Sequence, residues 1–69
     1  MKKFTVDEIG AIAGKVWGEL SANGEMTVAA VAKAIEEDQE DVAAAVGWLM
    51  REDKLVGKLD KRSVKFSLK

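Results

Sequence analysis

Apolar residues near the start of the chain recur every three or four positions, and this spacing predicts a helix over about residues 5–22. Thr5 and Glu8 have the spacing of a capping box, in which the glutamate side chain reaches back to the threonine amide. Gly24, after Asn23, ends the helix because both residues tolerate the left-handed backbone. The stripe expected to face the core consists of Ile9, Ile12, Ala13, Val16 and Leu20.

Two further stretches repeat the helical spacing, and a very short turn separates them. Thr27 is the expected N-cap of a helix that runs to about Glu36, after a very short strand at residues 25–26. Asp38 is the expected N-cap of the next helix, which has Asp41 at the capping partner's position and ends near residue 52 or 53. The expected buried positions are Val28, Val31, Ala32 and Ile35 in the first of these helices and Val42, Ala45, Val46 and Leu49 in the second.

Beyond residue 54 the apolar positions alternate with polar ones, a period of two that is typical of β-strands. Segments 55–59 and 63–69, with residues 60–62 between them as a turn, predict a β-hairpin. The register of its first strand stays open at this point. Its apolar face is expected to carry Leu55, Leu59, Val64, Phe66 and Leu68.

The order helix, short strand, helix, helix, strand, strand predicts an α+β fold, a winged helix-turn-helix. Two helices joined by a very short turn favour a helix-turn-helix, and the hairpin that follows the second of them forms the wing. Residues 1–69 are expected to make one such domain, because the chain is too short for two. A different α+β packing of the same elements is the alternative.

Three segments of the sequence resemble a compact bacterial family of single winged helix-turn-helix domains of unknown function. They are Gly-Lys-Val-Trp at 14–17, Asn-Gly-Glu-Met-Thr at 23–27 and the run from Glu40 to Glu52 that contains Gly-Trp-Leu. The resemblance covers nearly the whole chain, and it implies the fold while leaving the function open. The sequence departs from the family pattern at residues 36–39, where Glu37 stands in a place that is usually apolar.

Composition narrows the class of protein. The hydrophobic fraction of 48% is that of a globular chain rather than a disordered one. The absence of cysteine excludes disulfides and thiolate metal sites and suits a reducing compartment. The longest uncharged apolar stretch, residues 42–50, falls far short of the ~20 residues that span a bilayer. We therefore expect a cytoplasmic protein that does not enter the membrane.

The residue types that carry most enzyme chemistry are missing. The chain has no His, Cys or Tyr, so the three serines at 21, 63 and 67 lack an evident base. The acids at residues 36–41 lack the glycine-containing loop spacing of an EF-hand, and they are interpreted as a solvated, helix-capping cluster. No glycine-rich phosphate loop follows a strand. We expect no enzyme activity, no cofactor, no metal and no small-molecule substrate.

Charge is unevenly distributed, and this bears on nucleic-acid binding. Residues 1–50 carry four lysines against nine acids, net −5, whereas residues 51–69 carry seven cations against three acids, net +4. The third helix begins with acids and exposes Ala43, Ala44 and Gly47, so only Gln39 and Arg51, one at each end, are of the types that read base edges. Phosphate contact through a basic wing, as in a DNA-binding transcriptional regulator, is the alternative function. Its candidate residues are Arg51, Lys58, Lys61, Arg62 and Lys65.

Small residues point instead to a protein surface. Gly10, Gly14 and Gly18 share one side of the first helix, and each costs roughly 0.8–1 kcal/mol relative to alanine. Close approach of another backbone, from the same chain or from a partner, would offset that cost. Protein association is therefore the leading hypothesis, and the partner is a second copy in a homodimer or another cytoplasmic protein. The candidate interface residues are Gly14, Trp17, Gly18, Ala44, Gly47 and Trp48.

Overall fold

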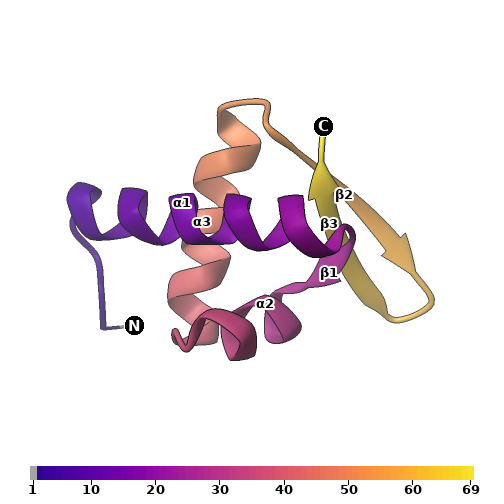
Figure 1. The fold of residues 1–69 in the computed structure, drawn as a ribbon, viewed down its shortest axis with the longest axis horizontal. Coiled ribbons are helices and arrows are strands. Elements are labelled where there is room, and N and C mark those ends of the chain that lie inside the picture. Colours follow the sequence, from indigo (N-terminus) through magenta and orange to yellow (C-terminus); the bar gives the residue numbers. More distant parts are fainter. Residues whose placement is uncertain (1) are drawn as a thin grey trace.

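The computed structural model describes residues 2–69, with Asp60 described by its backbone alone. Within this part of the chain, helices and strands follow one another in the predicted order (Figure 1). They are α1 (Val6–Asn23), β1 (Met26–Thr27), α2 (Val28–Ile35), α3 (Gln39–Arg51), β2 (Leu55–Asp60) and β3 (Ser63–Leu68).

The three helices form one body, and the hairpin projects from it. α1 crosses over α3, and α2 packs beside both helices at the end of the body where α3 begins (Figure 1). The strands form an antiparallel sheet in the order β1-β3-β2, so β3 is central. The hairpin of β2 and β3, which we call the wing, extends past the C-terminal end of α1. The predicted α+β arrangement of three helices and a C-terminal hairpin is confirmed.

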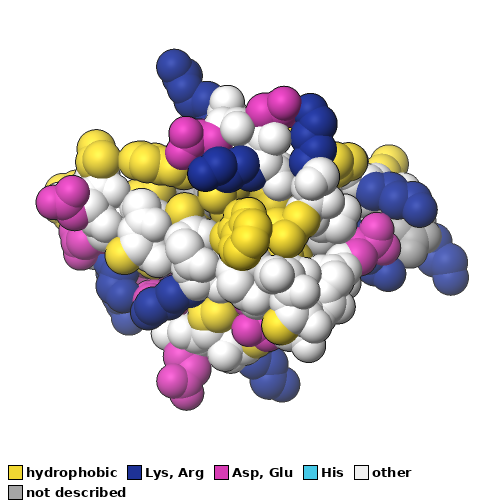
Figure 2. Space-filling view, turned by 45° about the horizontal axis from the view of Figure 1, so that its top comes forward, with side chains coloured by type: hydrophobic (Ala, Val, Ile, Leu, Met, Phe, Trp, Pro, Cys, Tyr) yellow, Lys and Arg dark blue, Asp and Glu magenta, His cyan; other side chains and the backbone are white. Residues whose placement is uncertain are grey.

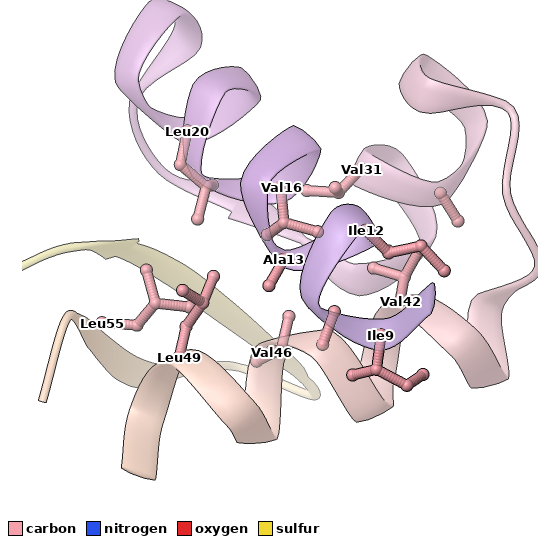
Figure 3. Close-up of a cluster of buried hydrophobic side chains, with 12 residues drawn as sticks. Ile9, Ile12, Ala13, Val16, Leu20, Val31, Val42, Val46, Leu49 and Leu55 are labelled. Carbon is pink, nitrogen blue, oxygen red and sulfur yellow. The ribbon is translucent and has the colours of Figure 1, made fainter. Parts of the chain in front are cut away.

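The core lies where α1 crosses α3 (Figure 3). Every position predicted to be buried in these two helices is buried, and Val31 and Ala32 of α2 join them. Leu55 adds the first residue of β2 and so fastens the wing to the helices. Each fully buried side chain of valine or leucine size contributes ~1.5–3 kcal/mol, so this crossing is the main source of stability.

The helix starts follow the sequence signals with small differences. Thr5 Oγ1 accepts a hydrogen bond from the Glu8 amide at 3.2 Å and donates one to the Glu8 carboxylate at 2.7 Å. The predicted contact of that carboxylate with the Thr5 amide is replaced by this hydroxyl contact. β1 lies one residue later than predicted, at Met26–Thr27. Thr27 belongs to the strand because it pairs with Lys65 of β3, and it also caps α2.

The start of α3 differs from the sequence prediction. Asp38 occupies the N-cap position, but its side chain makes no capping hydrogen bond. Asp41, expected to be its capping partner, is only 1% exposed and accepts the backbone N–H of Lys3 at 3.3 Å. The N-terminal segment therefore folds back onto α3, and Asp41 receives a donor from it instead of serving the helix end.

Glu37 is a charged residue in the turn between α2 and α3, and two lysines hold its side chain there. Its side chain is 7% exposed, and it accepts hydrogen bonds from Lys3 Nζ at 2.6 Å and from Lys15 Nζ at 3.0 Å. The hydrogen bond from Lys3, with that from Lys15 second, lowers the pKa of Glu37 below its ordinary value. The same contact raises the pKa of Lys3. Two cations thus replace the apolar packing that this place usually has.

The lowered pKa of Glu37 predicts a pH dependence of folding. A carboxyl group whose pKa is lower in the folded state stabilises that state above its unfolded pKa, and this contribution is lost as the pH falls through the folded pKa. We expect acid to reduce the free energy of unfolding of Glu37→Gln less steeply than that of the wild type. Urea denaturation between neutral pH and pH ~3 measures this. Glu36→Gln, which removes the same charge at the exposed neighbouring position, is the matched control.

Candidate functional site

A hollow of about 280 Å³ lies between α1 and the C-terminal end of α3. We call it the α1 groove. Hydrophobic side chains gather at the centre of this side of the molecule, and charged side chains border it (Figure 2). Lys54 adds a cation to the lining, and among the described side chains none forms an ion pair with it. The groove is lined by Gly10, Ala13, Gly14, Trp17, Leu49 and Lys54.

The glycines of α1 are not required by the packing of this chain. A Cβ at Gly14 or at Gly18 would meet no atom within 4 Å outside its own helical surroundings. A Cβ at Gly10 would lie 3.9 Å from Cζ2 of Trp48, an ordinary van der Waals distance. The sequence left open whether these glycines fit against the domain's own elements. For Gly14 and Gly18 the domain offers no such contact.

The two tryptophans differ in what they contact. Trp17 forms one wall of the α1 groove and is 45% exposed. Trp48 is half-buried, packs near Gly10, and donates a hydrogen bond from Nε1 to Glu52 Oε1 at 3.0 Å. The structure therefore brings Gly14 and Trp17 together in the groove, with Trp48 beside it and Gly18 one turn further along α1.

The other two candidate interface residues lie elsewhere on α3. Gly47 is exposed, has open space around it, and does not line the groove. Ala44 is partly buried and packs against the core. The other lining residues of the groove, which are Gly10, Ala13, Leu49 and Lys54, were not among the interface residues predicted from the sequence. For Gly10 a signal was present, since it lies four residues before Gly14 and continues the same side of the helix.

The acids around the start of α3 are largely engaged by the N-terminal segment and α1. Glu37 is held by Lys3 and Lys15, and Asp41 is buried. The Asp38 carboxylate lies 4.0 Å from Lys2 Nζ. These contacts reduce the repulsion that the acids at the start of α3 would exert on nucleic-acid phosphates. The exposed face of α3 still presents Ala43 and Gly47, which offer no donor to a base edge.

The five cations proposed for nucleic-acid contact do not form one cluster. Lys58 and Lys65 are directly opposite each other across β2 and β3, on the wing face that points away from the core. Lys61 and Arg62 form the turn, where Lys61 has a positive φ of 59°. Arg51 is the last residue of α3.

The apolar face of the wing is only partly covered. Leu59 and Val64 face each other across the hairpin on the core side, as predicted, yet they are 71% and 46% exposed. The reason is that the wing extends beyond the helices that cover Leu55. Met50 of α3, 46% exposed, sends its Cε toward Gly57 of β2.

Three helices followed by an antiparallel hairpin define the class as a winged helix-turn-helix domain. The family described as a winged helix-turn-helix domain (DUF2582) matches residues 1–68. The chain therefore belongs to this family, and the resemblance noted in the sequence is confirmed. A comparison with curated proteins gave no match. None of the described helices is both long and apolar enough to cross a bilayer.

Three solved structures with the same fold come from three different organisms. Protein BT2368 from Bacteroides thetaiotaomicron is 33% identical, with a TM-score of 0.82 over 87% of this chain and 73% of that one. The Zalpha domain of Carassius auratus PKZ, solved in complex with Z-DNA, is 23% identical, with a TM-score of 0.79 over 88% and 97%. The adhesin competence repressor AdcR of Streptococcus pyogenes is 27% identical, with a TM-score of 0.69; the match covers 99% of this chain but 48% of the repressor.

The open space at Gly14 and Gly18 predicts that alanine stabilises the isolated domain there. Gly14→Ala and Gly18→Ala should each raise the free energy of unfolding by about 0.8–1 kcal/mol, the difference in helix propensity. Urea denaturation followed by circular dichroism at low protein concentration measures this. Gly24→Ala is the contrast and should destabilise, because Gly24 has a φ of 77°. A loss of stability in Gly14→Ala would contradict the open space seen at that position.

Proposed function

We propose that this winged helix is a non-enzymatic protein-association module that uses the α1 groove as its contact surface. One observation carries the proposal: Gly14 and Gly18 have open space beside them, next to a tryptophan that is 45% exposed. Exposed tryptophans are enriched among the residues that dominate binding energy. Each glycine lowers the stability of α1 relative to alanine, and no contact within the domain compensates for this loss. Close packing of a partner helix against α1 would compensate for it.

A second copy of this chain is a partner that fits the spacing of the glycines. Gly10, Gly14 and Gly18 are symmetric about Gly14, so two α1 helices packed antiparallel around a two-fold axis would match glycine with glycine along their length. Such an isologous contact is the commonest form of homodimer. The positions Ala11, Trp17 and Ser21 beside the glycines are uncharged, which favours this contact, and Asp7 brings a charge to this side only at its N-terminal end.

Self-association makes a prediction in which one substitution has two opposite effects. Gly14→Ala should raise the stability of the monomer, as stated above, and weaken the dimer, because its methyl group holds the two helices apart. Sedimentation equilibrium at tens of micromolar measures the dimer. We expect the dissociation constant of Gly14→Ala to rise about tenfold, which corresponds to ~1.4 kcal/mol. Trp17→Ala should weaken the dimer at least as strongly.

Gly47→Ala is the matched control for this experiment. It also replaces an exposed helical glycine that has open space around it, but it lies outside the α1 groove. We expect it to leave the dissociation constant unchanged. Weakening by Gly47→Ala alone would move the interface to the outer face of α3. A wild-type protein that sediments as a strict monomer at these concentrations would remove self-association and leave another protein as the partner.

Contact with nucleic-acid phosphates through the wing is the second candidate. It is supported by the engagement of Glu37 and Asp41 within the domain, which removes acids from the surface that would face the phosphates. The Z-DNA complex of a domain with this fold and the similarity to a repressor add to its support. It predicts a salt-dependent complex with duplex DNA that Lys61→Glu with Arg62→Glu abolishes. Absence of binding in electrophoretic shifts at about 50 mM salt would discard it.

A further inference from the structure

The sheet has a free edge at β2. In the order β1-β3-β2, this six-residue strand pairs with β3 on one side only. The Lys69 amide donates to the Lys54 carbonyl at 3.0 Å, and from this pair the antiparallel ladder alternates. The backbone groups of Val56 and Lys58 therefore face β3, whereas those of Gly57 and Leu59 face outward. Neither Gly57 nor Leu59 uses these outward groups in a hydrogen bond within the part of the chain described.

Beside this edge, on the core side of the sheet, apolar atoms come close to the surface. A Cβ at Gly57 would lie 3.2 Å from Cε1 of Phe66 and 3.9 Å from Cε of Met50. Because Gly57 has no side chain, the Phe66 ring and the Met50 methyl group lie close to the backbone of the edge strand. Leu59 extends the same surface. An additional strand that carries an apolar side chain opposite Gly57 would pack on this platform.

The charges along the edge determine which charged side chains an added strand can carry. Lys54 precedes β2, Lys58 lies within it on the opposite face, and Lys61 follows it. None of the three side chains forms an ion pair among the described residues. An added strand with carboxylates on the face of Lys58 would be attracted to this edge, and one with lysines there would be repelled.

Natural sheets usually protect their edges by proline, by a bulge, by a short edge strand or by charged residues such as lysine. Of these devices β2 has only lysine. It contains no proline, its pairing with β3 runs without interruption from Leu55 to Asp60, and it is as long as its partner strand. The lysines can discourage pairing with other basic strands, but they leave the edge open to an acidic one.

We propose that the free edge of β2 binds an extended acidic segment of another protein by strand addition. The segment donates to and accepts from the outward backbone groups of Gly57 and Leu59. Its apolar side chain packs on Phe66 and Met50, and its carboxylate pairs with Lys58. This mode takes its affinity from main-chain hydrogen bonds and its specificity from alternate side chains. Apart from Lys54, which also lines the α1 groove, the site is separate from that groove, so either proposal can fail without the other.

A short acidic peptide tests the proposal. The probe is an acetylated and amidated nine-residue peptide in which valine and glutamate alternate. Its control has the same sequence with N-methyl groups on the amides of the valines, which removes the donors that would face β2. We expect the probe to slow hydrogen exchange at the Gly57 and Leu59 amides, measured by NMR on the full chain. The N-methylated peptide should bind at least about tenfold more weakly, the loss of a few hydrogen bonds of ~0.5–1.5 kcal/mol each.

Substitutions in the protein give an independent test. Leu59→Pro removes an outward amide without removing a bond to β3, and Lys58→Glu reverses the charge opposite the probe's carboxylates. Each should weaken binding of the probe by about tenfold or more in fluorescence anisotropy. Lys33→Glu makes the same charge change on the exposed side of α2 and should have no effect. If Leu59→Pro fails to fold, the N-methylated peptide still tests the hydrogen bonds.

Three results would overturn the proposal. The first is equal binding of the probe and its N-methylated control, which would mean that charge alone attracts the peptide. The second is protection of the Gly57 and Leu59 amides that rises with protein concentration without peptide, because β2 would then pair with a second copy. The third is displacement of the probe from β2 by duplex DNA at physiological salt, without slowed exchange of the Gly57 and Leu59 amides in the DNA complex. This result would mean that the edge binds nucleic acid rather than an added strand.

Discussion

The crossing of α1 over α3 is the contact on which the rest of the structure depends. A chain of 69 residues can bury only a small core, and nine of the twelve buried hydrophobic residues in the described part of the chain come from one stripe on each of these two helices. Using one side of α1 for the core leaves its opposite side with glycines and a half-exposed tryptophan. Leu55, Phe66 and Leu68 pack the base of the wing against this core, and the tip of the hairpin at Leu59 and Val64 stays outside the helical body. Both candidate surfaces therefore border this core, since Ala13 and Leu49 also line the α1 groove and Phe66 lies beside the free edge of β2.

Several of the charged side chains in this domain stabilise the fold and are not available to a partner. Glu37 and Asp41 read as surface acids of a recognition helix, yet one is enclosed by two lysines and the other is buried under the N-terminal segment. The net charge of a segment therefore says little about the charge it shows to a partner. The wing is one region where cations remain on the surface, at Lys58, Lys61 and Arg62.

Periodicity predicted the elements and most of the core, because burial of one helix face leaves a direct trace in the sequence. Residues Val42 and Leu49 were placed correctly for this reason. The sequence could not show that Lys3 reaches Asp41, since a contact between residues 38 positions apart depends on how the helices are packed. It identified Gly14 and Trp17 as candidates but not their shared groove, which exists only once α3 is placed against α1. The exposure of Leu59 was hidden too, because alternation marks the face of a strand and not how far the helices cover it.

The two ends of the described chain act as fasteners for loops that lie far from them in sequence. Lys3 closes the turn between α2 and α3, and Lys69 holds the loop between α3 and β2 through Asp53 and the Lys54 carbonyl. α3 is thus anchored at both extremities by residues that come before α1 and after β3. An affinity tag or fluorophore placed beside either lysine alters the support of this helix, so a label on the exposed side of α2 disturbs the domain least.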